Sequence, residues 1–327
     1  MEKCTITMVD QKQNYDHAIR KLEADGIRTV WEKRICNSQD PKTVIQYCKD
    51  STYIINGVEI WNNEVIDACP DLKLIVRYGV GYNNIDVETA TKRGIAVAYL
   101  PGMNAMAVAE HAVLLMMASL RKVGFMNCIL HNGGYKEGNE LTPQFNGKTI
   151  GVYGCGRIGK YVCQMLRGFD CRVLAYDVFP DEKFAREHNV TYVSADELMR
   201  QSDIITVHVP VLPETVHSIN KDTIAKMKDG VVIVNTSRGA TVCSEDLREA
   251  ILSGKVYAAG LDVYEDEGSS KPHALFEDLP QALLTPHVSA STFETYEKMI
   301  DKSVELIEQF RNGADISKWL LNPNYNK

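Results

Sequence analysis

The sequence lacks any long apolar run. Its longest unbroken apolar stretch, Ala112–Ala118, is far shorter than the ~20 residues that a membrane-spanning helix needs. The first ten residues, Met1–Asp10, have the pattern of a strand and contain no apolar segment typical of a secretory signal peptide. We therefore expect no membrane partner and no secretory leader.

An excess of positive charge is also missing. The chain has 36 lysines and arginines against 43 aspartates and glutamates, which gives a formal net charge of −7. This balance argues against a broad basic surface for nucleic acid or for an anionic membrane. We therefore expect neither nucleic acid nor an anionic membrane as a partner.

Paired cysteines are absent as well. The nine cysteines are an odd number, and no two of them form a Cys-x-x-Cys motif. This spacing disfavours a disulfide framework and a zinc site, so we expect free thiols, no metal and a cytoplasmic protein.

The composition is that of an ordinary globular chain. The 327 residues are 45% hydrophobic and 24% charged, enough for about two domains of ~150 residues each. Short β-branched runs alternate with helical patterns such as Tyr15–Ala24 and Pro41–Cys48. This alternation predicts an α/β protein with parallel sheets covered by helices. The first series of predicted strands comprises Thr5–Val9, Thr29–Trp31, Thr52–Ile55, Leu72–Val76 and Ala96–Tyr99.

A second series of strands follows a predicted long helix, Asn104–His131, and a glycine-rich break at Asn132–Tyr135. The chain then ends with a predicted helix, Phe293–Arg311. Two sheets are expected, the second inserted into the first. The strands of the second series are Thr149–Tyr153, Arg172–Tyr176, Ile204–Val207, Val231–Asn235, Ala258–Leu261 and Ala282–Leu284.

A glycine turn is the strongest local signal. Gly154, Gly156 and Gly159 form a GxGxxG motif that directly follows a predicted strand and opens the predicted helix Arg157–Gly168. In this context the motif is typical of dinucleotide binding, because the free N–H groups at the helix start point at the phosphates. Asp177 ends the next strand, where a carboxylate accepts ribose hydroxyls and repels a 2′-phosphate. The motif therefore predicts NAD rather than NADP.

Three strand-end segments and one loop carry a more specific pattern. They are Asn235–Gly239, Leu261–Glu267, Leu284–His287 and, nearer the amino terminus, Arg77–Asp86. In order and spacing they resemble the signatures of the D-isomer-specific 2-hydroxyacid dehydrogenase family, over nearly the whole chain.

The resemblance implies a fold and an assembly. A Rossmann-type NAD-binding domain over residues 103–293 would be inserted into a flavodoxin-like, discontinuous substrate domain made of residues 1–102 and 294–327. The family also implies a homodimer and an active site between the two domains.

The resemblance further implies which residues contact the ligands. Besides the three glycines, the family's cofactor contacts correspond to Arg157, Ile158, Asp177, Val209, Pro210, Thr215, Thr236, Arg238 and Asp262, the last of which would hold the nicotinamide amide. Its substrate contacts correspond to Arg77, Tyr78, Gly79, Val80 and Arg238.

The chemistry can be argued from residue types alone. Reduction of a 2-oxo acid needs a fixed cation for the carboxylate, an acid for the developing alkoxide and a nearby hydride. Arg238 suits the first role, because a guanidinium binds a carboxylate bidentately and stays charged. His287 suits the second, because histidine exchanges protons near neutral pH. Glu267 would hold the His287 ring and keep it protonated.

Each of these residues also has a simpler interpretation. Arg238 could be a surface charge, and His287 could be an ordinary loop histidine. Glu267 could belong to a solvated acidic run with Glu265 and Asp266. Two further histidines are interpreted as structural or secondary: His111 as a residue of a buried helix, and His208 as a neighbour of the predicted cofactor contacts Val209 and Pro210.

The sequence as a whole predicts an NAD-dependent oxidoreductase that converts a small 2-oxo acid, pyruvate-like or branched, into the D-2-hydroxy acid. Hydroxypyruvate, glyoxylate and 3-phosphohydroxypyruvate are alternative substrates. A second anion contact by Arg77 would favour a phosphorylated or dicarboxylate substrate, and Arg77 as a strand-end arginine in solvent is the equal alternative. An NAD-sensing, co-repressor-like binding protein is the alternative from another class, because fold alone does not fix function.

Overall fold

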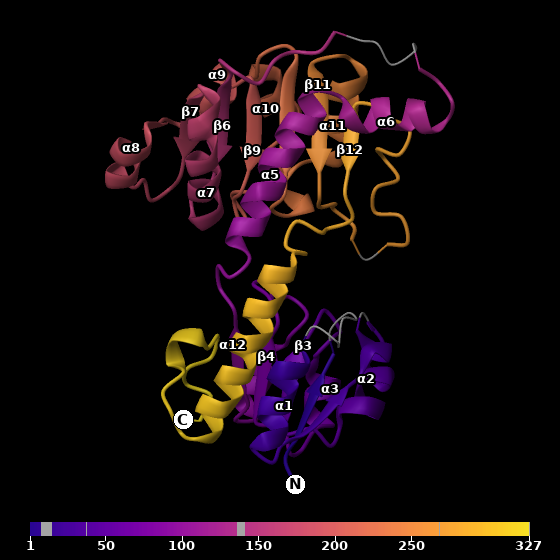
Figure 1. Ribbon diagram of the computed structural model, residues 1–327, viewed down its shortest axis with the longest axis vertical. Coiled ribbons are helices and arrows are strands. Elements are labelled where there is room, and N and C mark those ends of the chain that lie inside the picture. Colours follow the sequence, from indigo (N-terminus) through magenta and orange to yellow (C-terminus); the bar gives the residue numbers. More distant parts are fainter. Residues whose placement is uncertain (8–14, 37, 136–140, 268, 327) are drawn as a thin grey trace. The chain divides into compact units, whose positions relative to one another are not determined.

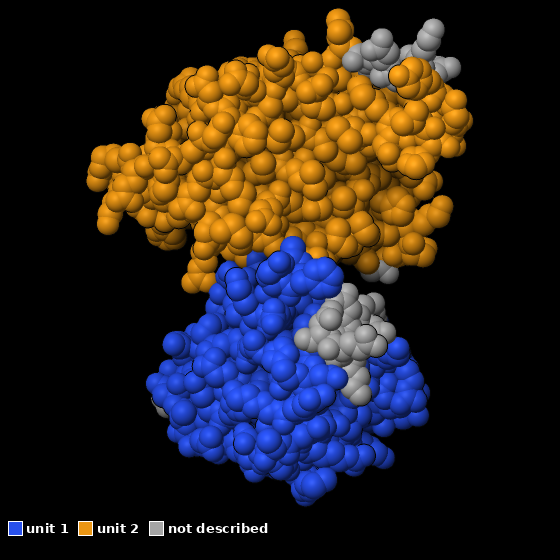
Figure 2. Space-filling view, in the orientation of Figure 1, with its two compact units in different colours: residues 1–104, 292–327 blue, residues 105–291 orange. Residues whose placement is uncertain are grey.

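The computed structural model describes residues 1–7, 15–36, 38–135, 141–267 and 269–326. The chain divides into two compact units (Figure 2). Unit 1 comprises Met1–Asn104 and Thr292–Lys327, and unit 2 comprises Ala105–Ser291. The domain boundaries predicted from the sequence, 102/103 and 293/294, each lie two residues from a boundary between the units.

Unit 1 is built on a five-stranded parallel sheet with the strand order β2-β1-β3-β4-β5. This is the flavodoxin-like order, in which the chain reverses direction across the sheet between β1 and β3. The predicted strands are correct within about two residues, although part of the predicted Thr5–Val9 lies outside the described residues. The strands are β1 (Lys3–Ile6), β2 (Arg28–Trp31), β3 (Tyr53–Asn56), β4 (Leu74–Arg77) and β5 (Ala96–Tyr99).

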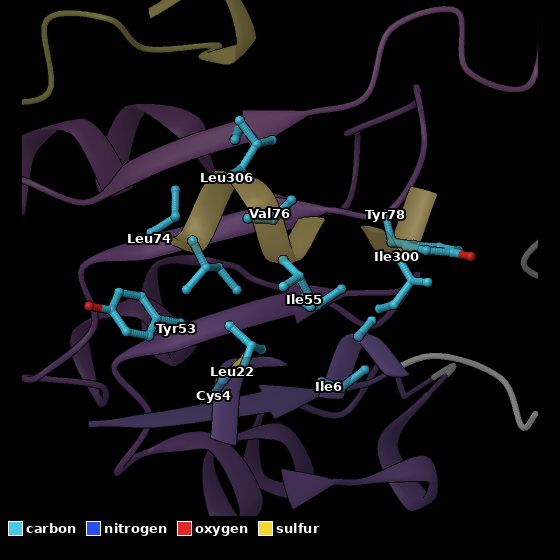
Figure 3. Close-up of a cluster of buried hydrophobic side chains, with 14 of the residues drawn as sticks. Cys4, Ile6, Leu22, Tyr53, Ile55, Leu74, Val76, Tyr78, Ile300 and Leu306 are labelled. Atoms are coloured by element: carbon cyan, nitrogen blue, oxygen red, sulfur yellow. The ribbon is translucent and has the colours of Figure 1, made fainter. Parts of the chain in front are cut away.

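The closing helix of the chain packs on this first sheet. Helix α12 (Phe293–Arg311) buries Ile300 and Leu306 against Ile55 and Val76 of the central strands (Figure 3). Burying a side chain of this size contributes ~1.5–3 kcal/mol, so α12 is an integral part of the unit 1 core. The other helices of unit 1 are α1 (Asp16–Ala24), α2 (Pro41–Cys48), α3 (Asn63–Asp67) and α4 (Val87–Lys92).

Unit 2 is built on a seven-stranded parallel sheet with the order β12-β11-β10-β9-β6-β7-β8. This is the doubly wound Rossmann order, and its direction reverses between β6 and β9. The sequence predicts six of these strands and misses the short edge strand β8. The strands are β6 (Thr149–Tyr153), β7 (Arg172–Tyr176), β8 (Val190–Tyr192), β9 (Ile204–Val207), β10 (Val231–Asn235), β11 (Val256–Leu261) and β12 (Ala282–Leu284).

Helices cover both faces of the second sheet (Figure 1). One face packs against α5 (Ala105–Leu120), α7 (Arg157–Leu166) and α8 (Glu182–His188). The other packs against α9 (Ala195–Gln201), α10 (Lys221–Lys226) and α11 (Ser244–Leu252). A parallel sheet buried on both faces explains the continuous apolar runs of its central strands.

The predicted single helix over Asn104–His131 is wrong. The structure contains two helices, α5 and α6 (Val123–His131), which meet at an angle of 67°. Lys122 between them has a φ of 49°, and a left-handed residue cannot continue a right-handed helix. Among the described residues no single helix could cross a membrane, and this bent pair passes the same test only when its two halves are taken together.

Candidate active site

The three predicted strand-end motifs lie side by side. Strands β10, β11 and β12 are neighbours in the sheet, and Asn235 pairs with Leu261, which pairs with Leu284. Their last residues therefore leave the same edge of the sheet. Ligands of open parallel sheets bind at this carboxyl edge.

Two of the predicted catalytic residues are joined by a hydrogen bond. His287 Nδ1 lies 2.9 Å from Glu267 Oε2. Because a carboxylate only accepts hydrogen bonds, Nδ1 carries the proton in this bond, and Nε2 points away from the glutamate. A second bond, from the Tyr264 backbone N–H to Glu267 Oε1 at 3.2 Å, fixes the carboxylate itself. The Glu267 carboxylate therefore orients the His287 ring, and the Tyr264 N–H orients the carboxylate.

Electrostatics favours the ionised form of Glu267. Partial burial opposes ionisation, but the hydrogen bond from His287 and the nearby charges of His287 and Arg238 outweigh it and lower the pKa of Glu267. A carboxylate and an imidazole in contact, beside a guanidinium, form the arrangement expected of a proton donor with its partner.

The structure separates Glu267 from the other acids of its run. Glu265 accepts the backbone N–H of Ser244 at 2.7 Å and binds His217 Nε2 at 2.5 Å. It therefore joins the start of α11 to the loop between β9 and α10. Of Glu265 and Glu267, only the latter holds the His287 ring.

The backbone at His287 is held in an uncommon conformation. His287 has a φ of 52°, in the left-handed region that few non-glycine residues occupy. The buried carboxylate of Asp262 accepts the N–H groups of the next two residues, Val288 and Ser289, both at 2.9 Å. Strained residues of this kind persist where their surroundings over-determine them, and they often lie at functional sites.

Arg238 is placed by a close approach between two loops. A Cβ on the next residue, Gly239, would lie 1.9 Å from the carbonyl carbon of Tyr264. Only glycine therefore allows the turn after β10 to touch the chain that leads to Glu267. Asn235 reinforces the turn by donating to the Arg238 carbonyl at 3.0 Å.

The glycine turn has the geometry that a pyrophosphate requires. Gly154 has a φ of 98°, and a Cβ there would lie 2.8 Å from Val209 N. A Cβ on Gly159 would lie 2.3 Å from Gly154 O, so this glycine allows α7 to pack against its strand. A Cβ on Gly156 would meet nothing within 4 Å. The open space above Gly156, at the start of α7, leaves room for the phosphates.

The remaining predicted cofactor contacts lie along the same carboxyl edge. Arg157 and Ile158 open α7, Asp177 follows β7, and Val209 and Pro210 follow β9. The Thr215 hydroxyl donates to the Pro210 carbonyl at 2.5 Å and so folds this loop on itself.

Polar groups suited to a dinucleotide are present. The Thr236 hydroxyl is buried and has no partner, which is costly unless a ligand supplies one. Asp262 accepts three hydrogen bonds through its two oxygens, and a carboxylate has about four acceptor positions. The Asp262 side chain is fully buried, so its contact with the nicotinamide amide stays a prediction. The Asp177 carboxylate accepts the Phe179 N–H at 2.9 Å, which fixes it next to the glycine turn.

The loop predicted to contact substrate is organised by Arg77. Its Nε donates to the Gly81 carbonyl at 2.6 Å, and its NH1 donates to the Tyr78 carbonyl. The guanidinium therefore lies against the loop's own backbone, where it braces Gly79 and Val80. Tyr78 is buried, and its hydroxyl donates to the Tyr296 carbonyl at the start of α12.

Sequence reasoning missed a buried acid behind this loop. Glu59 is fully buried, and its Oε1 accepts from Thr7, Asn56 and Trp61 at 2.5, 2.7 and 3.0 Å. Its other oxygen, Oε2, has no partner. Asn84, on the loop after β4, donates to the Glu59 carbonyl at 2.8 Å. A lone glutamate in a short loop gives no sequence signal for such a network.

Glu59 should make the stability of the protein depend on pH. Burial raises its pKa above the ordinary value of 4.5, despite the three hydrogen bonds that lower it. Between pH 4.5 and the raised pKa of Glu59, the folded state binds more protons than the unfolded state. The free energy of unfolding therefore falls as the pH rises through this range. Glu59→Gln should remove this fall. Thermal unfolding against pH would measure it, with the exposed Glu64→Gln as control, and parallel curves for wild type and Glu59→Gln would contradict the assignment.

Comparison with known proteins identifies the family. The model for the D-isomer specific 2-hydroxyacid dehydrogenase NAD-binding domain matches residues 113–289, more than half of the chain. A hydroxypyruvate reductase of Blautia hydrogenotrophica is 34% identical over 302 residues, which cover 90% of this chain and 92% of that protein. The chain belongs to this family. Its members are oxidoreductases that act on the CH–OH group of 2-hydroxy acids with NAD.

The chain is also similar to a longer relative and to a solved structure of the family. A D-3-phosphoglycerate dehydrogenase of Archaeoglobus fulgidus is 44% identical over 231 residues, or 71% of this chain. The chain spans only 44% of the length of that relative. The structure of D-lactate dehydrogenase from Aquifex aeolicus, complexed with NAD and lactic acid, superposes with a TM-score of 0.81 at 27% identity, covering 98% of this chain and 99% of that one. The two-domain fold and the NAD-binding domain predicted from the sequence are thereby confirmed.

Asp177 should make this dehydrogenase prefer NAD over NADP. The 2′-phosphate of NADP would meet a carboxylate that the Phe179 N–H holds in place. Removing the charge with Asp177→Ala should narrow the preference by about fivefold or more, since a unit charge at close range is worth ~1 kcal/mol or more. Specificity constants for NADH and NADPH would measure the change, with Asp181→Ala as a neighbouring control. Equal constants in the wild type would refute the role.

Proposed function

We propose that this dehydrogenase uses NADH to reduce a small 2-oxo acid with one carboxylate to the D-2-hydroxy acid. The observation that carries the proposal is the 2.9 Å bond between His287 and Glu267 at the carboxyl edge of the second sheet. Arg238, Thr236 and Asp262 lie at the same edge and supply the other groups that this reaction needs.

The residues divide the chemistry among them. Bound NADH supplies the hydride. Arg238 binds the substrate carboxylate and polarises the 2-oxo group. The His287 ring, held through Nδ1, gives its Nε2 proton to the oxygen that becomes the hydroxyl. Glu267 stabilises the positive charge of that ring until the proton leaves.

The choice of substrate class rests on how the Arg77 guanidinium is held. A phosphorylated or dicarboxylate substrate needs a second cation, and Arg77 is the candidate on the predicted substrate loop. Its guanidinium instead binds the loop carbonyls of Tyr78 and Gly81. Moving it to a ligand would leave these carbonyls to find new donors. This arrangement supports pyruvate-like or branched 2-oxo acids, with hydroxypyruvate and glyoxylate as small variants, over 3-phosphohydroxypyruvate.

Turnover of NADH with a panel of 2-oxo acids tests the proposal. The panel comprises pyruvate, a branched 2-oxo acid, hydroxypyruvate, glyoxylate and 3-phosphohydroxypyruvate. We expect kcat/KM for at least one monocarboxylate to exceed that for the phosphorylated compound by about tenfold or more, which corresponds to ~1.4 kcal/mol. A preference for 3-phosphohydroxypyruvate would overturn the substrate class. NADH binding without turnover of any compound would favour the NAD-sensing alternative.

The surface of α6 supports a homodimer. This apolar helix buries none of its residues, and Val123 and Leu130 are 51% and 60% exposed. Leu114 on the adjoining α5 is 58% exposed. Exposed apolar side chains on neighbouring elements are typical of a protein interface. We take a second copy of the chain as the partner that covers this surface, in line with the family resemblance.

The nine free cysteines agree with the proposal that the protein works in a reducing compartment such as the cytoplasm.

Sedimentation measures the predicted dimer. The wild type should sediment as a dimer at micromolar concentration, and the double variant Val123→Lys, Leu130→Lys should sediment as a monomer. Leu252→Lys is the matched control, because Leu252 is 63% exposed and lies on α11, which covers the other face of the sheet. A monomeric wild type would refute the dimer, and a control that also dissociates would refute the choice of α6.

A further inference from the structure

Helix α5 contacts the strand ends that carry the proton donor. It packs across β10, β11 and β12 in unit 2 (Figure 1). His111, on the second turn of α5, has a side chain that is only 16% exposed. Its Nε2 lies 3.0 Å from the Thr285 hydroxyl and 3.6 Å from Asp262 Oδ1. This histidine therefore reaches the segment that precedes His287.

The direction of each hydrogen bond can be assigned. The Thr285 hydroxyl has one proton, which it donates to Asp262 Oδ1 at 2.5 Å, because a carboxylate can only accept. The same hydroxyl must then accept from His111, so His111 carries a proton on Nε2. The three side chains form a chain of donors that runs from α5 to the buried carboxylate.

The far end of this chain holds the backbone around His287. Asp262 accepts the N–H groups of Val288 and Ser289, which follow His287 directly. On the preceding side, the Tyr264 hydroxyl donates to the Thr285 carbonyl at 3.0 Å. The left-handed backbone of His287 thus lies between two anchored segments. If Thr285 or Asp262 shifts, the position of the ring shifts with it.

We propose that His111 is a positioning residue for the proton donor. Its Nε2–H orients the Thr285 hydroxyl toward Asp262, and Asp262 then fixes the backbone that aims the His287 ring at the substrate. This inference rests on the proposed 2-oxo acid reductase activity. It assigns a role in that reaction to a helix residue that has the appearance of an ordinary core histidine.

Substitutions at both ends of the first bond test the proposal. His111→Phe keeps a ring but removes the donor, and His111→Gln keeps an N–H. Thr285→Val removes the hydroxyl at nearly constant shape, and Thr285→Ser keeps it. Ser119→Ala is the control on the same helix, because the Ser119 hydroxyl is buried without a partner and its loss removes no hydrogen bond.

The rate is expressed per NADH-binding site, so that a loss of folded protein is not mistaken for a misplaced proton donor. For His111→Phe and Thr285→Val we expect kcat to fall by about 10–10²-fold, because a misplaced reacting group can lower a rate by ~10². The KM for the 2-oxo acid should stay within about threefold, because Arg238 is untouched. His111→Gln and Thr285→Ser should recover most of the rate, and Ser119→Ala should match the wild type.

Each contrary outcome is distinct. If His111→Phe fails to fold, the Thr285 pair gives the result by itself. Normal kcat in the folded Val or Phe variants would overturn the proposal, as would conservative variants no better than the disruptive ones. A wild type that reduces no 2-oxo acid would instead overturn the proposed function and this inference with it.

Discussion

Replacing His287 by alanine should lower the maximal rate of 2-oxo acid reduction by about 10²–10⁴-fold, the usual contribution of a positioned acid or base. The substrate oxygen would lose its proton donor, while the glycine turn that receives NADH would be unchanged. NADH binding should therefore persist, and a fluorescence titration beside the steady-state rate would establish this. A variant that keeps its maximal rate would remove His287 from the mechanism.

Glu267→Gln tests the partner of the donor through pH. The hydrogen bond and the charge of His287 hold the Glu267 carboxylate in its ionised form, so the wild-type rate should fall in acid, when the carboxylate takes up a proton. Glu267→Gln has no carboxylate to titrate, so it should lack this acid fall and should reduce the 2-oxo acid slowly throughout. The pKa of Glu267 is lowered from 4.5, so the ion pair persists as the pH falls through the ordinary carboxyl range and is lost only below it.

The pH–rate profiles of wild type and Glu267→Gln, both at saturating NADH, measure this difference. Asp266→Asn is the matched control, since it removes the adjacent acid of the same run. The control should follow the wild-type profile. An unshifted profile in Glu267→Gln with a normal rate would exclude Glu267 and return Glu265 and Asp266 to consideration.

Gly239→Ala should nearly abolish activity and destabilise unit 2. The new Cβ would lie 1.9 Å from the Tyr264 carbonyl carbon and 2.3 Å from Glu265 N. Since both neighbours are backbone atoms, the turn that carries Arg238 must separate from the chain that leads to Glu267. Overpacking of this kind destabilises by ~1–3 kcal/mol, and misplacing Arg238 should lower kcat/KM by about 10²-fold.

Two other glycines provide controls for this prediction. Gly168 and Gly156 both have open space where a Cβ would lie. Gly168→Ala should change neither the melting temperature nor the rate. Gly156→Ala should fold normally and weaken NADH binding, because the pyrophosphate approaches the backbone there. Thermal unfolding with steady-state kinetics would distinguish the three variants, and a stable, active Gly239→Ala would contradict the close approach.

Local patterns were sufficient for most elements of the fold. The short apolar runs of β5, β6, β7, β9, β10 and β12 predict these strands at their observed bounds, because buried parallel strands are continuous apolar segments between turn residues. The break at Lys122 escapes such reasoning. The apolar pattern continues from α5 into α6, and a left-handed lysine has no sequence signature.

The candidate site divides in the same way. By itself the sequence determined the glycine turn and the strand-end positions of Arg238, Glu267 and His287, since short motifs encode local backbone geometry and residue chemistry. The tertiary structure alone decided that Glu267 rather than Glu265 holds the His287 ring, and that Arg77 binds its own loop. It also decided that His111 reaches Thr285 across 174 positions of sequence. The contact of His111 with Thr285 joins segments that are distant in the chain, and only the order of strands in the sheet brings them together. The other two contacts depend on how the loops fold after the strand ends, which short motifs do not encode.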